Sequence, residues 1–188
     1  MNDILARALG HHQAGRLIEA EALYRELLAG QPDHPDALHY LGVLALPGGD
    51  GDEAVRLITR SLEHVSGNVD ALNNLGQAFV ALNQFDDAED AYRKAIAAAP
   101  GDAQAHVSLG DLLAGRGDFT AAAECLEAAL RVEPDDPHLL VNLGNARQAS
   151  GDLDGALAAF ERAQAVAPDF AEAHYNLGRA WQDLGPPG

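Results

Sequence analysis

A small residue returns every 34 positions along the whole chain, and this period constrains the fold more than any other feature of the sequence. Three elements repeat in one register, namely a Leu-Gly pair, an alanine and a proline. The members are Gly42, Gly76, Gly110, Gly144 and Gly178; Ala20, Ala54, Ala88, Ala122 and Ala156; and Pro32, Pro100, Pro134 and Pro168. A period of this length is typical of a solenoid, in which similar supersecondary units stack and bury one another's apolar faces.

Each 34-residue unit has the pattern of two helices joined by a turn. In the third unit, apolar residues spaced three and four apart form one face of each helix, and Pro100 ends the second helix. The sequence therefore predicts an all-α fold, a single solenoid domain of antiparallel helix pairs over residues 1–188. Its repeats are residues 1–34, 35–68, 69–102, 103–136 and 137–170, and one further helix follows over 171–185.

The repeated small residues predict how the two helices of a pair pack. Glycine at position 8 and alanine at position 20 allow the helices to come very close, and bulkier residues at position 24 fill the space beside that contact. We expect large replacements at Gly110 or Ala122 to be among the most damaging changes. The residues at position 24 are Tyr24, Ile58, Tyr92, Leu126 and Phe160.

Polar residues near the helix starts predict N-caps, whose side chains accept hydrogen bonds from free backbone amides. Asn68, Asp102 and Asp136 suit the first helices of their units. Asp86, with Glu89 three residues on, suits a capping box at a second helix. The residues equivalent to Asp86 are Asp52, Thr120 and Asp154, and glycine recurs at the turn between the helices as Gly15, Gly49, Gly117, Gly151 and Gly185.

The second unit departs most from the repeated pattern. Pro47 falls at position 13 and is expected to end the first helix early. Gly51 lies where Phe85 and Phe119 supply an anchor, and Ser66 replaces the proline that ends the unit elsewhere. These departures predict that this unit has the lowest local stability of the array.

The combination of Leu-Gly at positions 7 and 8, Ala at 20, a large residue at 24, Ala at 27 and Pro at 32 resembles the tetratricopeptide repeat. The resemblance covers the whole chain. It implies a right-handed superhelix whose first helices line a concave groove, as in bacterial arrays found alone or ahead of domains like those of O-linked N-acetylglucosamine transferases. It also implies a non-enzymatic scaffold that binds a peptide or partner protein in that groove. The alanines at position 27 include Ala95, Ala129 and Ala163.

The composition limits the classes of molecule that the protein is expected to bind. Twenty-nine acidic residues against 12 basic ones give a formal charge of −17, which repels phosphate backbones and anionic membrane surfaces. We therefore expect protein or peptide partners rather than nucleic acid. No apolar run approaches the length of a membrane span, and the first residues lack the pattern of a secretory signal, so we expect a cytoplasmic protein.

Polar residues at groove positions 6 and 9 are the candidate ligand contacts. A row of carboxamides can hydrogen-bond the backbone of an extended peptide with little regard for its side chains. The Asn-Leu-Gly triplets at 74–76, 142–144 and 176–178 resemble the asparagine ladder of O-linked N-acetylglucosamine transferases, although an asparagine at this position also fits simply because it is polar. The predicted contacts are Asn74, Gln77, Asn142, Asn145, Asn176, Arg179 and Tyr40.

The sequence offers no pattern for catalysis, a cofactor or a metal. The eight histidines lack the i, i+4 spacing with a third ligand that a zinc site needs, so we expect structural roles for them. Cys125 is the only cysteine, and no serine or cysteine pattern suggests a nucleophile with its base. The family's carboxylate clamp for acidic C-termini needs lysines and arginines at groove positions 2, 5 and 6, and the sequence has none at these positions.

The last helix leaves alternatives open. Leu177, Trp181 and Leu184 lie on one face, for which the sequence supplies no partner helix. The tryptophan either folds over the fifth unit or forms a docking surface for a further domain or for another copy of the chain. The alternatives to a free-standing scaffold are thus the substrate-recruiting arm of a larger transferase and a scaffold that self-assembles through this helix.

Overall fold

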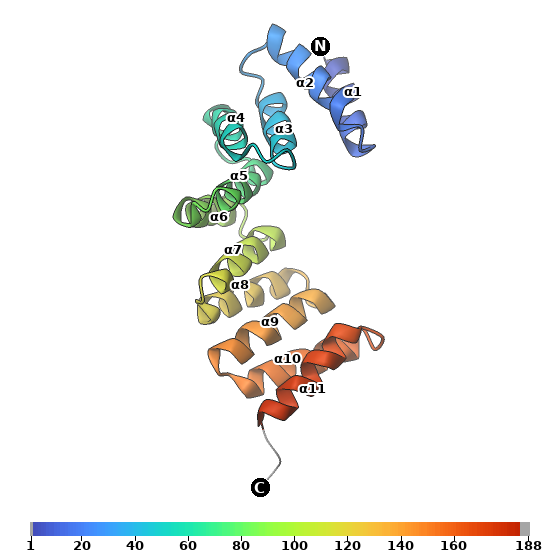
Figure 1. Cartoon of the computed structure of the whole chain (residues 1–188), viewed down its shortest axis with the longest axis vertical. Coiled ribbons are helices and arrows are strands. Elements are labelled where there is room, and N and C mark those ends of the chain that lie inside the picture. The colour runs from blue at the N-terminus through green and yellow to red at the C-terminus, as the bar shows by residue number, and fades with distance from the viewer. Residues whose placement is uncertain (1, 185–188) are drawn as a thin grey trace. The chain divides into compact units, whose positions relative to one another are not determined.

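The computed structural model describes residues 2–184, and the surroundings of the side chains from Asp3 to Asp183. This part of the chain contains eleven α-helices and no strand (Figure 1). The helices are α1 (Asn2–Gln13), α2 (Leu17–Gly30), α3 (Pro35–Ala45), α4 (Gly51–His64), α5 (Val69–Ala81), α6 (Phe85–Ala98), α7 (Ala103–Gly115), α8 (Phe119–Val132), α9 (Pro137–Ser150), α10 (Leu153–Val166) and α11 (Ala171–Leu184).

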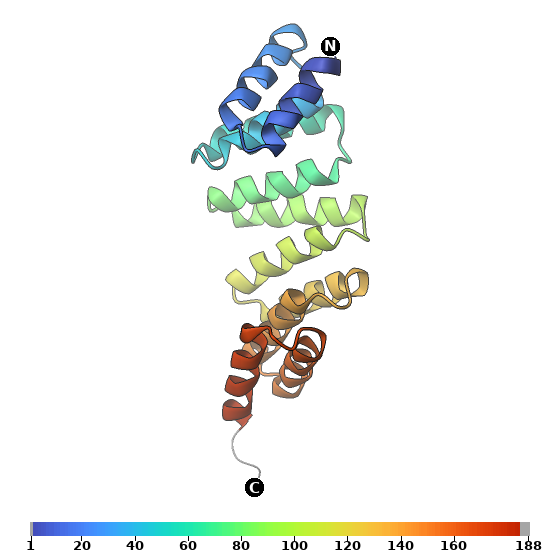
Figure 2. The same cartoon turned by 90° about the vertical axis from the view of Figure 1, so that its right-hand side faces the viewer.

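The chain divides by its contacts into two compact units, Met1–Ala98 and Ala99–Gly188. In unit 1, α1 packs with α2, α3 with α4 and α5 with α6, and α2 and α4 also pack against the pair that follows. In unit 2, α7 packs with α8 and α9 with α10, α8 packs against α9, and α11 lies on α10 and α9 (Figures 1 and 2). The fold is an all-α solenoid of helix pairs, and each predicted repeat contains one pair.

Alanine at position 20 belongs to the buried core of every repeat. All five of these alanines are fully buried, at 0% exposure, and the large residue at position 24 is at most 3% exposed in every repeat. Together these residues form an apolar seam between the two helices of each pair. The alanines are Ala20, Ala54, Ala88, Ala122 and Ala156.

Glycine at position 8 is not equally necessary in every repeat. A Cβ atom added at Gly144 would lie 2.3 Å from the ring of Phe160, and one added at Gly76 would lie 2.4 Å from the ring of Tyr92. At Gly110 the nearest atoms would be 3.4 Å away, because the facing residue there is Leu126. The close approach is thus strictest where position 24 is aromatic, and Gly110 has room for one methyl group.

The predicted caps of the first helices are confirmed. The side chains of Asn68, Asp102 and Asp136 each accept a hydrogen bond from the amide three residues on, at 3.0, 2.7 and 3.1 Å. His34 caps α3 through Nδ1 in the same way, at 3.4 Å from the amide of Ala37. These bonds satisfy backbone donors that the helix itself leaves free.

The predicted caps of the second helices are wrong by two residues. Asp50, Asp118 and Asp152 accept the capping bonds, from the amides of Glu53 (3.1 Å), Ala121 (3.2 Å) and Gly155 (2.9 Å). Each helix begins at the residue that directly follows its cap, so the predicted residues lie inside its first turn. There the acidic ones still favour the helix through its dipole. The misplaced caps are Asp52, Thr120, Asp154 and Asp86, the last lying inside α6.

This correction predicts different costs for two neighbouring substitutions in α8. Asp118→Ala should lower the free energy of unfolding by about 1 kcal/mol, the usual value of an N-cap. Thr120→Ala should change it by less than about 0.5 kcal/mol, because surface replacements away from such features have small effects. Urea denaturation of the two variants measures the difference, and an equal loss in both would show that Asp118 is not the cap.

The turn between the helices of a pair uses a left-handed residue in every described repeat. Gly15, Gly49, Gly117 and Gly151 have φ of 72°, 78°, 83° and 92°, as predicted, and Asn83 takes the equivalent place with φ of 59°. Asparagine tolerates this conformation better than other residues with a side chain. Gly185 lies outside the described residues.

The second repeat contains the predicted short helix. α3 has 11 residues and ends at Ala45, two residues before Pro47. Gly51, at the position where two other repeats have a phenylalanine, is buried. A Cβ atom added there would lie 2.7 Å from Leu82 Cδ2, so the side chain of Leu82 occupies the space beside it. The lower stability of this repeat stays a prediction. We expect its amide protons to exchange faster than those of repeats 3 to 5, and uniform protection would contradict it.

Candidate functional site

The candidate ligand contacts lie on the surface formed by the first helices of the repeats, which we call the first-helix face. In unit 1 this face is formed by α1, α3 and α5, and in unit 2 by α7, α9 and α11. Because the two units are separate compact bodies, each part of the face is described within its own unit.

Aromatic rings cluster on the first-helix face of unit 1. Tyr40 on α3 stacks on Tyr24, with ring centroids 5.8 Å apart, and on His39, with centroids 4.9 Å apart. The ring of His12 meets both tyrosines edge-on, and its Nδ1 lies 3.3 Å from the hydroxyl of Tyr24. Tyr24 is fully buried, so the cluster joins the core of the first repeat to its surface.

Asn74 is tied to this cluster by a hydrogen bond between neighbouring repeats. Its Nδ2 lies 2.9 Å from Nε2 of His39, which is only 2% exposed. An amide nitrogen can only donate, so Nε2 is the acceptor and the imidazole is neutral. Burial lowers the pKa of His39, an effect that Asp70 and Asp36 oppose and His12 supports. Part of the hydrogen-bonding capacity of Asn74 is thus used inside the protein.

The buried imidazole predicts that unit 1 loses stability in mild acid. In the unfolded chain His39 titrates near its ordinary pKa of 6.5, whereas burial lowers that pKa in the folded protein. Protons therefore bind the unfolded chain more readily, and the stabilising contribution present above pH 6.5 is lost as the pH falls through the folded pKa. Urea denaturation at pH 7.5 and 5.5 measures the loss, which should shrink in His39→Gln. An equal pH dependence in both proteins would contradict the prediction.

The remaining predicted contacts of unit 1 differ in accessibility. Gln77 on α5 is exposed, and Tyr40 is half-buried. The pKa of the Tyr40 hydroxyl is raised by burial and further by the charges of Asp36 and Asp70. The accessible groups of this face therefore include the amide of Gln77 and part of the Tyr40 side chain.

Unit 2 contains a small pocket on its first-helix face. Asp111 of α7 and Asn142 and Asn145 of α9 carry its polar groups, and the pocket has a volume of about 170 Å³. Asn142 is half-buried and Asn145 is exposed. The rest of the lining is apolar or small and comes from Ala114, Phe119, Leu126 and Ala146.

Asp111 supplies the only charge that lines this pocket, among the described residues. Although its side chain is exposed overall, neighbouring atoms remove enough water from the carboxylate to raise its pKa above 3.8. A partly desolvated carboxylate is stabilised by a cation or a hydrogen-bond donor placed beside it. The pocket thus offers an acceptor charge and two amides above an apolar floor. The two amides are predicted contacts, whereas Asp111, which shares position 9 with Asn145, was not among the predicted residues.

The predicted contacts of α11 are not brought together as a binding surface. Asn176 is only 5% exposed, so its amide does not face an approaching ligand. Arg179 is exposed, and its guanidinium carbon lies 5.9 Å from the ring centroid of Tyr175. Leu177 is half-buried and Trp181 is 51% exposed, while the side chain of Leu184 lies outside the described residues.

The histidines at position 4 have structural contacts. Nε2 of His106 lies 3.0 Å from the carbonyl oxygen of Pro100, and Nε2 of His174 lies 2.6 Å from that of Pro168. Each closes the turn that leads into its own helix. Within residues 2–184, no group of three or more His, Cys, Asp or Glu side chains is arranged to hold a metal ion, and no helix there is long and apolar enough to cross a membrane.

Comparison with known proteins identifies the family. Models described as tetratricopeptide repeat match residues 5–63, 48–103, 73–137 and 113–177. The chain therefore belongs to the tetratricopeptide repeat family, and these models indicate no catalytic family. No curated protein sequence is significantly similar to the chain.

Several solved structures share the fold. The crystal structure of MamA aligns with a TM-score of 0.78 at 22% identity, over 88% of this chain and 96% of MamA. YrrB, described as a tetratricopeptide repeat protein with an unusual peptide-binding site, aligns with a TM-score of 0.75 at 22% identity, over 92% of this chain and 89% of YrrB. TTC0263, a thermophilic protein of Thermus thermophilus, aligns with a TM-score of 0.69 at 23% identity, over 96% of this chain and 98% of TTC0263.

Proposed function

We propose that this protein is a non-enzymatic scaffold that binds a peptide segment of a partner protein on its first-helix faces. The observation that carries the proposal is the pocket of unit 2, where Asp111, Asn142 and Asn145 surround an apolar floor. A peptide backbone needs both donors and acceptors, and a carboxamide supplies both. A structural neighbour, YrrB, is described as having a peptide-binding site, which supports this kind of function for the fold.

The charge of the site favours a basic peptide. A lysine or arginine side chain can lay its methylene groups on the apolar floor and bring its cation to Asp111. Such a cation would offset the desolvation that raises the pKa of this carboxylate. The formal charge of −17 attracts basic segments over longer distances and speeds their encounter.

Unit 1 offers a second position of the same character. The hydroxyl of Tyr40 can hydrogen-bond a peptide, and the charges of Asp36 and Asp70, which raise the pKa of that hydroxyl, attract a cation. Gln77 is exposed on α5 and can hydrogen-bond a peptide backbone. Asn74 contributes through its remaining amide groups, and the buried Asn176 is left out of the proposed contacts. A cytoplasmic location is part of this proposal.

Binding of short labelled peptides tests the proposal. The probe is a capped hexapeptide of alternating lysine and leucine, measured by fluorescence anisotropy, with glutamine and glutamate versions for comparison. We expect the lysine peptide to bind best. Asp111→Asn should weaken it about fivefold, or about 1 kcal/mol, the upper end for an ion pair at an exposed side chain.

The control removes the same charge elsewhere in unit 2. Glu161→Gln changes an exposed carboxylate on α10, outside the first-helix face, and should alter the affinity less than twofold. Equal losses of affinity in both variants would show that the effect comes from the net charge of the protein and not from a contact with Asp111. Equal binding of the lysine and glutamate peptides would contradict the proposal.

Self-assembly is a second candidate, favoured by the aromatic surface of α11. Tyr175 is 67% exposed and Trp181 is 51% exposed on the same helix. Large exposed aromatic groups of this kind often mark an interface. Light scattering over a concentration series tests it, since a monomer mass at every concentration would remove this candidate.

A further inference from the structure

Basic residues are unevenly distributed in this acidic chain. Of the 12 lysines and arginines, six line two pockets formed between consecutive second helices. The two pockets occupy equivalent places, one in each unit, and each has leucines from positions 4 and 7 of a first helix as its floor. The six arginines are Arg25, Arg56 and Arg60 in unit 1, and Arg131, Arg147 and Arg162 in unit 2.

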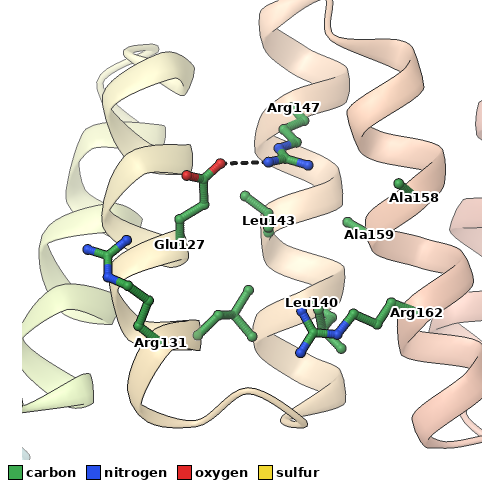
Figure 3. Close-up of a pocket in the computed structure, with 9 residues that line it drawn as sticks. Glu127, Arg131, Leu140, Leu143, Arg147, Ala158, Ala159 and Arg162 are labelled. Carbon is green, nitrogen blue, oxygen red and sulfur yellow. Dashed lines mark hydrogen bonds and ion pairs between the residues drawn. The ribbon is translucent and has the colours of Figure 1, made fainter.

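The pocket of unit 2, which we call the basic pocket, lies between α8 and α10 with α9 as its floor (Figure 3). It has a volume of about 390 Å³, and Leu140 and Leu143 form its floor. Figure 3 shows Glu127 and Arg147 facing each other at one end, and Arg162 reaching from α10 over Leu140 at the other end. Glu127 and Arg147 pair at 2.6 Å.

The pocket beside Asp111, which we call the peptide pocket, and the basic pocket lie on different sides of α9. Leu140 and Leu143 line the first, whereas Asn142 and Asn145 line the second. Residues two apart on a helix point about 200° apart, because each residue turns the helix by about 100°. The two pockets can therefore be occupied at the same time, by ligands of opposite charge.

In unit 1, every arginine of the equivalent pocket is paired with a carboxylate of the protein. Arg25 pairs with Glu21 at 2.8 Å, Arg56 pairs with Glu53 at 2.6 Å, and Arg60 pairs with Asp33 at 2.5 Å. This pocket is also smaller, at about 280 Å³. Its cations are thus already neutralised.

The basic pocket is larger, and its cations are less fully paired. Ala158 and Ala159 stand where Arg56 and Leu57 fill the pocket of unit 1. Arg162 donates to the carbonyl oxygen of Pro134 at 2.5 Å, while its nearest carboxylate, on the 75% exposed Asp135, is 3.5 Å away.

Arg131 is the arginine of the pocket with the fewest polar interactions. Among the residues that the structure describes, it makes no hydrogen bond or ion pair. It starts from α8 at the same end as Arg162, with its guanidinium turned away from α9 (Figure 3). Because Arg131 is exposed, a rotation of its side chain can bring that group to an anion at the pocket.

We propose that the basic pocket binds an acidic, leucine-containing segment of a partner protein. A leucine side chain fits the floor formed by Leu140 and Leu143, and flanking carboxylates pair with Arg162 and Arg131. Charge complementarity supports this occupant, because Arg131 has no carboxylate partner among the described residues and the nearest carboxylate to Arg162 is 3.5 Å away. In unit 1, by contrast, the three arginines pair with carboxylates at 2.8, 2.6 and 2.5 Å. The apolar floor disfavours a nucleic acid, whose phosphate backbone offers no aliphatic side chain to cover Leu140 and Leu143.

The test is a titration of the methyl-labelled full-length chain, followed by NMR, with a capped hexapeptide of alternating glutamate and leucine. We expect saturable shifts of the methyl signals of Leu140 and Leu143, and no comparable shifts for Leu38 and Leu41 in the equivalent pocket of unit 1. The glutamine version of the peptide should bind at least fivefold more weakly. Arg162→Gln should weaken the glutamate peptide at least fivefold.

The control is Arg93→Gln, which removes an exposed guanidinium from the second helix α6, where it pairs with Glu89. It should change the affinity less than twofold. Absence of shifts at Leu140 and Leu143, or equal affinity for the glutamine peptide, would overturn the proposal. So would shifts at these methyl groups that follow protein concentration without peptide, since they would identify a second copy of the chain as the occupant. The peptide pocket is not involved in this readout, so either proposal can fail alone.

Discussion

Replacing Gly144 by alanine should lower the free energy of unfolding by about 1–3 kcal/mol, the usual cost of overpacking a core. The added methyl group would lie 2.3 Å from the ring of Phe160, which is fully buried. Alanine is the better helix former by about 1 kcal/mol, so a loss of stability would show that the contact outweighs propensity. Urea denaturation measures the effect.

Gly110→Ala is the matched control for this substitution. Its methyl group would meet atoms no closer than 3.4 Å, so the gain in helix propensity should leave it neutral or stabilising. Phe160→Leu copies the Gly110–Leu126 arrangement and should restore at least about 1 kcal/mol to Gly144→Ala, a coupling typical of residues in contact. Equal effects at Gly110 and Gly144, or additive losses in the double variant, would contradict this account of the packing.

Replacing Ala122 by leucine should cost about 3 kcal/mol, at the upper end of overpacking effects. Ala122 is fully buried, and its carbonyl oxygen is already among the atoms nearest to Gly110 on the facing helix. Three more carbon atoms cannot enter this contact unless α7 and α8 separate. Hydrogen exchange should therefore show loss of protection first in these two helices.

Ala165→Leu provides the comparison for this substitution, because Ala165 is exposed on α10 and the same atoms are added in water. It should change the free energy of unfolding by less than about 0.5 kcal/mol. If both leucine variants were equally stable, the closeness of the two helices could not be the basis of the seam.

The helix pairs were predictable from the sequence because similar local signals recur from repeat to repeat. The size matching of positions 8 and 24, proline at the unit end and glycine at the turn act within one repeat, and the recurrence of each signal in most repeats reinforces the prediction. The uneven need for glycine was also readable in principle. Position 24 is aromatic opposite Gly76 and Gly144, and it is leucine opposite Gly110.

The candidate site was less predictable, since it depends on contacts between repeats. Position 6 identifies Asn74 as a surface amide, but its hydrogen bond to His39 comes from the preceding repeat. The burial of Asn176 depends in the same way on how α11 lies on α9 and α10. Asp111 was not predicted because a carboxylate does not fit the pattern of carboxamides, although it shares position 9 with Asn145.

The most direct test of the binding account maps the lysine peptide on the protein by methyl NMR. The account predicts saturable shifts at Leu126 and Ala146, which line the pocket beside Asp111, and their loss in Asp111→Asn. Shifts only at residues outside this pocket, with the signals of Leu126 and Ala146 unchanged at saturation, would contradict the account.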